Sequence, residues 1–382
     1  MKPKTTKLIP LLILEIILIF GLTVYSYSQV DLNLTLSTNA FYQKLQQPLL
    51  ILGYFNRPVS TQILVVLLTG LFLVYFLSLW LVKKQVMTRK QMWWMIGISS
   101  LLILAYPAFS HDLFNYMFDA RIVTKYGLNP TFFRALDFPA DPWIRFMRWT
   151  HRFYPYGIGW LWLTLIPSYL GLGKFVWTMV LFKLMFLGFH AMNIKLIEKI
   201  LKQVSGANID HGLIFFALNP LVLVESLLSP HNEVMMLSLV LLAIYLFITH
   251  KATWSILTLM VSVSIKFLSI GLLPLFLIKK LQNKLVPWSF YLWLLVLLPV
   301  VWQREPYSWY IIPLVALAAI SQSVTCKVLA VALSVATLVR YLPFFWFGDY
   351  GGVTGRYQFW GMWLSLIVAV GILSIWRKKL LI

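Results

Sequence analysis

The sequence predicts an all-α, polytopic membrane protein with about twelve transmembrane helices. Of its 382 residues, 60% are hydrophobic and only 12% are charged, and the mean hydropathy is +0.81. Soluble globular chains carry roughly 25% charged and about 45–50% apolar residues, so the composition excludes that class. Since a transmembrane helix needs about 20 mostly apolar residues, the apolar content is enough for roughly a dozen spans.

The charge is strongly basic, with 32 Lys and Arg against 12 Asp and Glu and a net charge of +20. A basic excess often indicates a nucleic-acid partner. Here the basic residues lie at the ends of apolar segments and form no single patch, so no nucleic acid is expected. The single cysteine, Cys326, excludes an internal disulfide and a cysteine metal cluster.

Apolar runs separated by charged clusters are the expected membrane elements. In chain order they are Leu8–Tyr27, Gln62–Val82, Trp93–Phe109, Tyr156–Leu172, Phe175–Ile194, Leu213–Leu228, Val234–Thr249, Trp254–Ile278, Val286–Trp302, Trp309–Gln322, Val328–Phe347 and Phe359–Trp376. The first run follows lysines as a signal peptide would, but it is longer than the usual apolar core of about 7–15 residues. We therefore expect it to be a retained anchor.

The orientation follows from where Lys and Arg gather, because basic loops stay in the cytoplasm. The clusters are Lys2/Lys4/Lys7, Lys83/Lys84/Arg89/Lys90, Lys195/Lys199/Lys202, Lys251, Lys279/Lys280/Lys284, Lys327 and Arg377/Lys378/Lys379. These clusters predict a membrane protein with both termini in the cytoplasm. The remaining polar segments are then expected to face the extracytoplasmic side.

Two apolar runs cannot be simple single crossings if all the basic clusters are to lie on the cytoplasmic side. The run Tyr156–Leu172 is short and broken by Pro167, which favours a re-entrant or interfacial segment. The run Trp254–Ile278 lies between two inner clusters, so it is expected to form two short helices that turn near Lys266 at the outer face. The result is a single transmembrane catalytic domain over residues 1–382, without internal repeats, whose longest outer loops are Ser28–Thr61 and Ser110–Pro155.

The loop Ser110–Pro155 is the expected active-site segment. Asp112 follows a membrane helix by two residues, and a carboxylate held at an apolar boundary has the surroundings that raise its pKa and position a general base. The alternative is that Asp112 only caps the next helix, Leu113–Tyr126. That helix has an apolar stripe and ends at Gly127, so it is expected to lie flat on the outer membrane surface. Asp119 on this helix is expected to orient a neighbour or to form a salt bridge.

The second candidate is the turn His231-Asn232-Glu233 between two apolar runs. Glu225 precedes it inside an apolar run, where an unpaired carboxylate is costly. These residues indicate a polar pocket at the outer face, although a helix cap with a solvated turn remains an alternative. Lys266 lies among apolar residues and either snorkels to a headgroup or binds an anion.

Further cations are expected at outer helix ends, namely Arg304, Arg340 and Arg356, and a lipid phosphate is the natural ligand for them. The sequence contains no GxGxxG, GxxxxGK[ST], HExxH, GxSxG or CxxC motif. Its outer loops are too short for a nucleotide-binding Rossmann unit. A group transferred at this surface is therefore expected to arrive on a membrane lipid.

The chain resembles the GT-C fold glycosyltransferases, and in particular bacterial polyprenol-phosphate-mannose-dependent mannosyltransferases. The resemblance rests on a series of short motifs between about Trp93 and Tyr310. They are Ser110-His111-Asp112-Leu113-Phe114-Asn115-Tyr116, Phe118-Asp119-Ala120-Arg121, Tyr126-Gly127-Leu128-Asn129-Pro130, Tyr154-Pro155-Tyr156-Gly157, His231-Asn232-Glu233, Ser264-Ile265-Lys266-Phe267 and Trp309-Tyr310. The first loop is also similar to the eukaryotic enzyme that adds the first mannose to glycosylphosphatidylinositol precursors.

The resemblance implies an inverting hexosyltransferase, with mannose as the expected sugar and a polyprenyl-phosphate sugar as donor. The acceptor would be a glycan or glycolipid of the cell envelope, and membrane lipids are the other expected partners. Asp112 would be the general base, and Lys266 would stabilise the leaving phosphate. The predicted substrate-binding residues are His111, Asn115, Asp119, Arg121, Tyr156, His231, Asn232, Glu233, Lys266 and Arg304.

The chain departs from the family pattern at three places. His111-Asp112 replaces a paired acid, Thr131 follows Asn129-Pro130 in place of Tyr, and Glu233 replaces an Asp. Sugar identity and a divalent cation, Mg²⁺ or Mn²⁺, are therefore left open. A lipid-linked-sugar flippase or other transporter is the alternative function, and a noncatalytic membrane subunit is a third. Transporters concentrate charge at mid-membrane in repeated halves, whereas this chain concentrates its polar residues on one face.

Overall fold

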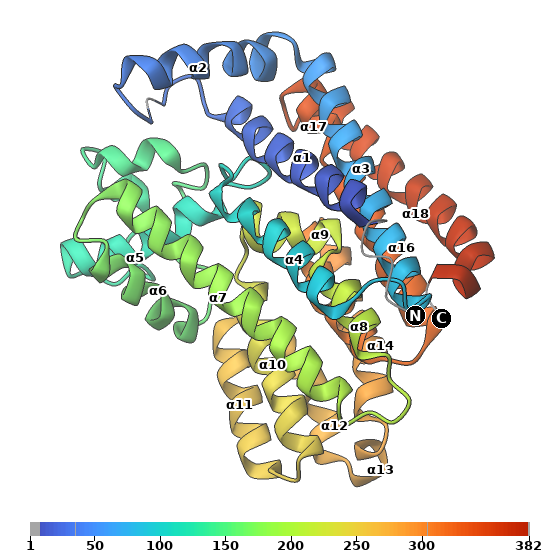
Figure 1. Ribbon diagram of the computed structural model, residues 1–382. Helices are drawn as coiled ribbons and strands as arrows, with labels where there is room; N and C mark the ends of the chain where they lie inside the picture. The colour runs from blue at the N-terminus through green and yellow to red at the C-terminus, as the bar shows by residue number, and fades with distance from the viewer. Residues whose placement is uncertain (1–7, 35, 304, 381–382) are drawn as a thin grey trace.

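The computed structural model describes residues 8–34, 36–303 and 305–380, and these residues form helices, turns and loops without any strand (Figure 1). The predicted all-α class is thereby confirmed. The helices, in chain order, are α1 Ile9–Ser26, α2 Ala40–Leu50, α3 Arg57–Lys83, α4 Arg89–Ser99, α5 Asp112–Tyr126, α6 Ile158–Leu170, α7 Phe175–Leu201, α8 Ile209–Ala217, α9 Pro220–Leu223, α10 Glu233–Ile248, α11 Ala252–Ile265, α12 Leu273–Leu277, α13 Lys279–Gln282, α14 Leu285–Gln303, α15 Ile312–Ile320, α16 Val324–Val339, α17 Leu342–Phe347 and α18 Gly352–Leu380. Short 3₁₀ or π segments join several of them, including η4 Ser100–Leu104, η7 Val224–Leu228 and η8 Phe267–Leu272.

Six helical segments among the described residues are long and apolar enough to cross a membrane, or seven if the bent pair of α8 with α9 and η7 counts as one span. They are Ile9–Gln29, Arg57–Lys83, Phe175–Leu201, Leu285–Gln303, Val324–Phe347 and Gly352–Arg377. This is fewer than the predicted twelve. The difference arises because several apolar runs of the sequence fold as shorter helices of 10–17 residues, among them α6, α10 and α11.

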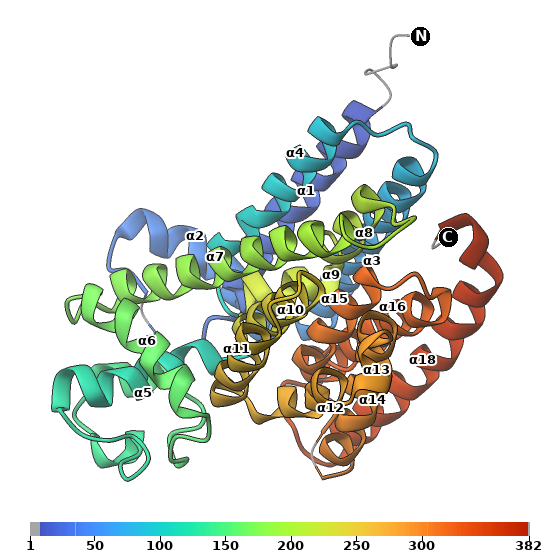
Figure 2. The ribbon, with the colours of Figure 1, turned by 90° about the horizontal axis from the view of Figure 1, so that it is seen from below.

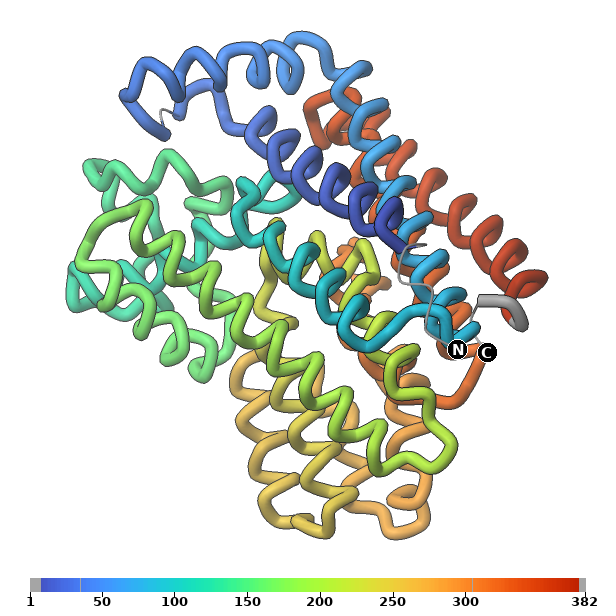
Figure 3. Tube along the Cα trace, in the orientation of Figure 1, coloured from blue at the N-terminus to red at the C-terminus, as the bar shows by residue number. Residues whose placement is uncertain are grey.

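The run Trp254–Ile278 has the predicted form of two short helices. Helix α11 ends at Ile265, Lys266 is extended with φ −150° and ψ 124°, and η8 and α12 continue the chain. Figure 3 shows α10 and α11 as an antiparallel hairpin that brings the start of α10 near the end of α11. Glu233 and Lys266 therefore share one end of the hairpin.

Helix α7 connects two ends of the molecule. At about 1.5 Å per residue, its 27 residues span roughly 40 Å. Both Figure 1 and Figure 2 show α5 and α6 near its beginning and α8 near its end. The loop that carries Asp112 and the predicted inner charges are thus at opposite ends of one long helix.

Two of the predicted inner clusters meet where α7 ends. Arg89 at the start of α4 lies 2.5 Å from Glu198 and 3.4 Å from Asp210, and Lys202 lies 3.0 Å from the same glutamate. Lys195 lies over the Trp93 ring. The start of α4 and the end of α7 therefore bring their cations together at one place.

Buried charges inside the helical bundle hold its parts together. Ser99 Oγ donates to Glu15 Oε1 over 2.7 Å and joins α4 to α1. Lys183 of α7 donates to the carbonyls of Ile103, over 2.8 Å, and Ala105. Carbonyls at a helix end need donors of this kind. Lys183 thus fixes the chain where η4 ends and the segment leading to Asp112 begins.

Helix α5 begins at Asp112, one residue before the predicted start, and it ends as predicted, with Gly127 as a left-handed C-cap at φ +66°. Its surroundings differ from the expected membrane surface. Every residue from Leu113 to Ile122 is buried, including Asp119 and Arg121. Helices α6 and α7 and the rest of the loop pack around it. The residues of the predicted apolar stripe are buried as expected, and neighbouring segments also cover the polar side of the helix.

Candidate functional site

Asp112 is the first residue of α5, and its side chain is largely buried with 14% of its surface exposed. Burial raises the pKa of this carboxyl, while the charges of His231 and Lys266 act in the opposite direction. Its backbone N–H donates to Ser110 Oγ over 3.2 Å. The N-cap position of α5 is His111, and no side-chain cap is formed there. The structure therefore does not support the alternative that the Asp112 side chain only caps the helix.

His231 faces Asp112 from the turn before α10. Its Nε2 lies 3.8 Å from Asp112 Oδ2, and its Nδ1 lies 2.9 Å from Glu225 Oε2. The imidazole is 1% exposed and stacks on Trp309 at a centroid distance of 4.1 Å. Burial lowers the pKa of His231, but Glu225 and Asp112 outweigh it and the pKa is raised. The ring is therefore held between two carboxylates in the orientation that favours its protonated form.

Glu225 belongs to the polar pocket predicted from the sequence, although it was not among the predicted substrate-binding residues. It lies in the π-helical segment η7, fully buried. Its Oε1 accepts hydrogen bonds from Ser308 over 2.5 Å and Tyr341 over 3.0 Å, and its other oxygen faces His231. A carboxylate within an apolar run was the available sequence signal, and π-turns often occur at functional sites.

A backbone hydrogen bond joins the two halves of the site. The N–H of Phe109 donates to Ser229 Oγ over 3.0 Å. Phe109 precedes Asp112 by three residues, and Ser229 precedes His231 by two. The contact therefore holds the two segments in register, although they are 120 residues apart in the chain.

Lys266 completes the cluster from the break between α11 and η8. Its ammonium contacts the Glu233 carboxylate, lies 3.4 Å from Asn232 Oδ1 and sits over the Tyr310 ring. The Lys266 side chain is 18% exposed and that of Glu233 only 1%. The cation predicted for an anionic ligand is thus present beside Asp112, with one carboxylate already paired to it.

Polar residues of α5 continue from Asp112 into the protein. Asn115 and Asp119 follow it at the third and seventh positions, which places all three on one side of the helix. Burial, with the nearby charge of Asp112, raises the pKa of Asp119 to about 8. The predicted salt bridge of Asp119 is not among the ion pairs of the described residues. Tyr156 packs against Tyr116 at a centroid distance of 5.3 Å next to this stripe.

Arg121 belongs to a different cluster. Its Nε lies 2.8 Å from Asp141 Oδ2, which also accepts from Lys125 over 2.8 Å and Tyr126 over 2.6 Å. Its guanidinium lies over the Trp143 ring at 3.9 Å. We call these contacts of Asp141 the Asp141 clamp. It joins the loop to α5, and it pairs Arg121, which the sequence predicts to bind substrate, with Asp141.

His111 also faces away from its neighbour Asp112. Its ring packs against Tyr106 and Phe114, and its Nε2 lies 3.7 Å from Asp31 Oδ2. The structure therefore brings together Asp112, His231, Asn232, Glu233 and Lys266, whereas His111 and Arg121 lie in separate clusters. Arg304 falls outside the described residues.

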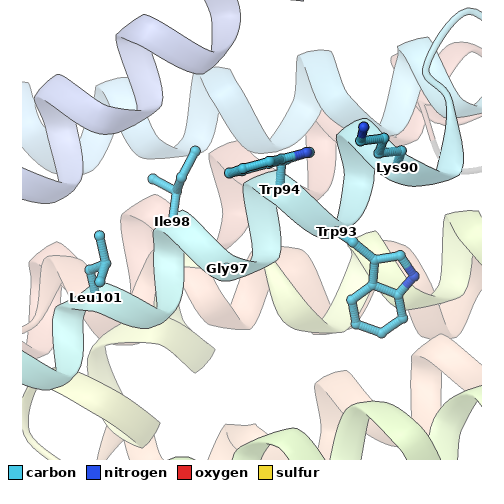
Figure 4. A pocket seen from close by; sticks show the side chains of 6 residues that line it. All are labelled: Lys90, Trp93, Trp94, Gly97, Ile98 and Leu101. Carbon is cyan, nitrogen blue, oxygen red and sulfur yellow. The ribbon is translucent and has the colours of Figure 1, made fainter.

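An apolar hollow of about 560 Å³ lies elsewhere, along α4 (Figure 4). Trp93, Trp94, Ile98 and Leu101 line it, and Lys90 stands at its end. No carboxylate lines this hollow, and Lys90 belongs to an inner basic cluster. None of the residues that line the hollow belongs to the Asp112 cluster.

The donor set at Asp112 fits a proton-transfer site better than a divalent-cation site. Over the part of the chain that the structure describes, no three His, Cys, Asp or Glu side chains form a metal-binding group. Divalent Mg²⁺ prefers several oxygen ligands. Here one carboxylate faces an imidazole, and the next carboxylate, Glu233, is paired with Lys266.

Comparison with known proteins identifies the family. No curated protein and no solved structure matches the chain significantly. Residues 33–281, more than half of the chain, match the family model described as alpha-(1->6)-mannopyranosyltransferase, N-terminal domain. This range contains Asp112, His231 and Lys266 together with Glu225. The chain therefore belongs to the alpha-(1->6)-mannopyranosyltransferase family, a family of membrane glycosyltransferases that act on mannose.

Proposed function

We propose that this protein is an inverting mannosyltransferase that uses a polyprenyl-phosphate mannose donor and Asp112 as general base. The observation that carries the proposal is the series Asp112, His231 and Glu225, with separations of 3.8 Å and 2.9 Å. Its exposed member is Asp112, at 14%, whereas the two behind it are 1% and 0% exposed. An acceptor can therefore reach the carboxylate but not its supports.

The reaction is a single displacement at the anomeric carbon. Asp112 removes the proton of an acceptor hydroxyl, and that oxygen forms the new bond to the sugar. The bond between the sugar and the lipid phosphate breaks, and its electron pair leaves with the phosphate. Because attack and departure occur on opposite faces of the sugar, the configuration inverts.

His231 is a positioning residue for this base. A protonated imidazole next to Asp112 stabilises the carboxylate form, which is the form that accepts a proton. Glu225 keeps the imidazole protonated, and Ser308 and Tyr341 keep Glu225 in place. The arrangement lets Asp112 remain ionised in surroundings that otherwise favour its neutral form.

The remaining cluster is proposed to bind the substrates. Lys266 supplies positive charge for the leaving phosphate, which needs no strong general acid. Asn115 and Asn232 each have a buried amide atom without a hydrogen-bond partner among the described residues, namely Asn115 Oδ1 and Asn232 Nδ2. Such atoms are suited to sugar hydroxyls. Asp119, Tyr156 and Glu233 complete the proposed contacts.

We further propose that the site lies on the extracytoplasmic face of the plasma membrane, with both termini in the cytoplasm. About twelve crossings are proposed, which counts shorter apolar helices such as α10 and α11 in addition to the long spans. The opposite positions of the inner cations and of Asp112 along α7 support this orientation. The acceptor is proposed to be a glycan or glycolipid of the cell envelope. The lipid chain of the donor is proposed to lie in the membrane that the apolar helices cross.

Transfer of radiolabelled mannose from polyprenyl-phosphate mannose in isolated membranes tests the proposal. The wild-type chain is expected to label an extracytoplasmic acceptor, and D112N is expected to abolish labelling at equal expression. Full labelling by D112N would overturn the assignment of the base. Transport of the lipid-linked sugar across proteoliposomes without any transfer would instead favour a flippase.

A further inference from the structure

A polar cavity is lined in part by Ala108 and His111 of the segment that leads to Asp112. Its volume is about 290 Å³. The side chains that decide its chemistry are Asp31, Tyr54, Arg57, His111, Arg148 and Tyr350. Asp112, His231 and Lys266 do not line it. We call it the Arg57 pocket.

The Arg57 pocket joins parts of the chain that are far apart in sequence. Arg57 begins α3, Asp31 follows α1, and Arg148 belongs to the loop after α5. Phe344 and Gly348 come from the end of α17, which packs on α3. These C-terminal residues lie beyond the matched family range of 33–281. The pocket is thus a tertiary feature of this chain.

Positive charge in the Arg57 pocket exceeds negative charge. Arg148 lies 3.5 Å from Asp31, which is the carboxylate that lines the pocket. Arg57 lies over the Tyr54 ring at 5.0 Å, and no ion pair within the described ranges neutralises it. One guanidinium is therefore left without a counter-charge at the cavity wall.

The Arg57 guanidinium packs closely against Gly348 at the wall of the pocket. Gly348 has φ +83°, and a Cβ added there would lie 2.5 Å from Arg57 Cζ. The glycine therefore admits the guanidinium where any other residue would displace it. Tyr54 donates a hydrogen bond to Asp31 Oδ1 over 3.0 Å and fixes the opposite wall.

His111 supplies an independent indication of a ligand. Its side chain is 5% exposed, and its Nε2 has no hydrogen-bond partner among the residues described. The nearest carboxylate oxygen, of Asp31, is 3.7 Å away, too far for a hydrogen bond. A buried polar atom normally has a partner, so a ligand in the cavity would satisfy it.

The position of the Arg57 pocket at the ends of candidate membrane spans indicates the class of its ligand. Candidate spans end at Gln29 and Phe347, and another begins at Arg57. The cavity therefore lies where apolar helices meet polar loops, which is the level of lipid headgroups for helices that cross a membrane. Guanidinium groups bind phosphate through paired N–H donors.

We propose that the Arg57 pocket is a binding site for a phosphate ester, separate from the transfer site and independent of its chemistry. Arg57 and Arg148 hold the phosphate oxygens, and His111 Nε2 donates the third contact. Asp31, held by Tyr54 and Arg148, is left to accept a hydroxyl of the group esterified to the phosphate. The ester belongs either to a membrane lipid or to a free phosphate compound.

Native mass spectrometry of the full chain, purified in detergent from membranes containing phosphatidylglycerol, tests the lipid source. The wild type is expected to retain the lipid, and R57Q and R148Q are each expected to lose about tenfold or more in affinity. R145Q is the matched control, because Arg145 is an exposed arginine of the same loop that does not line the pocket. Arg148 is one third exposed, so R148Q can report binding even if R57Q fails to fold.

A titration with inorganic phosphate, followed by the melting temperature, tests the free source. Stabilisation of the wild type and R145Q but not of R148Q, without lipid retention, supports a free phosphate compound. Absence of both effects in the wild type, or equal losses in R145Q, overturns the proposal. D112N is expected to bind like the wild type, so a failure of the proposed transfer reaction remains distinguishable from a failure of this site.

Discussion

Asp112 and Asp141 lie in the same loop and are both largely buried, yet their pKa values shift in opposite directions. Asp141 accepts hydrogen bonds from Arg121, Lys125 and Tyr126, and these donors overcome burial and lower its pKa below the ordinary 3.8. Asp112 has its nearest cation, His231, at 3.8 Å, and burial raises its pKa.

The difference shows that two carboxylates of one loop can differ in role, because the number of hydrogen-bond donors around each one differs. A carboxylate that is supplied with donors stays ionised and holds the fold, because taking a proton would break its contacts. A carboxylate with few donors keeps its lone pairs available for a substrate hydroxyl. The following changes test this contrast, from the largest expected effect to the smallest.

Asp112→Asn is expected to reduce mannosyl transfer by about 10²–10⁴-fold, the range typical for loss of a general base. Its effect on the free energy of unfolding is expected to be small, since a neutral amide suits the buried position. Initial transfer rates and melting temperatures measure both. Asp137→Asn is the control, because Asp137 is exposed in the same loop; equal losses of transfer in the two variants would refute the role of Asp112.

Asp141→Asn is expected to show the reverse pattern, a destabilisation of about 3 kcal/mol with transfer retained while the protein is folded. The reason is that the buried Arg121 loses its carboxylate partner. Thermal unfolding in detergent measures the change. An unchanged melting temperature would show that the Asp141 clamp contributes nothing to the loop.

The two carboxylates are expected to titrate in different pH ranges, because the pKa of Asp141 is lowered and that of Asp112 is raised. Because the pKa of Asp141 is lowered on folding, its stabilisation is present above pH 3.8 and is lost as the pH falls through the folded value. Transfer needs ionised Asp112, so the rate should rise as the pH rises through a value above 3.8. A rate that is flat across this region would contradict a raised pKa for the base.

Glu225→Gln is expected to move the pH profile of transfer upward by about 1 unit. Without the Glu225 charge the pKa of His231 falls, so the imidazole becomes neutral and no longer favours the ionised form of Asp112. The amide keeps a hydrogen-bond acceptor for Ser308 and Tyr341. A lower rate with an unmoved profile would show that Glu225 has only a structural role.

Ser229→Ala gives the smallest expected effect, about 1 kcal/mol in the free energy of unfolding. The change removes the acceptor for the Phe109 N–H, which joins the Asp112 segment to the His231 turn. A decrease in kcat without a change in the pH profile is also expected, since the geometry but not the charges would change. A shifted profile would mean that Ser229 acts on the ionisation of Asp112.

The sequence by itself determined the helical class, and it indicated Asp112 and the turn His231-Asn232-Glu233 as the candidate site. Composition and apolar runs are enough for the class, because helices in a membrane must satisfy their own backbone groups. Asp112, His231, Glu233 and Lys266 could be selected because charges next to apolar segments are costly and few. The family model is consistent with the same reading of the chain.

Only the tertiary structure decided which of these side chains meet. Neither the pairing of Arg121 with Asp141 nor the turn of His111 toward Asp31 has a sequence signal, because both contacts depend on how the loop folds back on α5 and α1. Burial of α5 on all sides likewise depends on neighbours from distant parts of the chain. Charge and hydrophobicity are properties of residues, whereas a pKa, an ion pair and a cavity are properties of their surroundings.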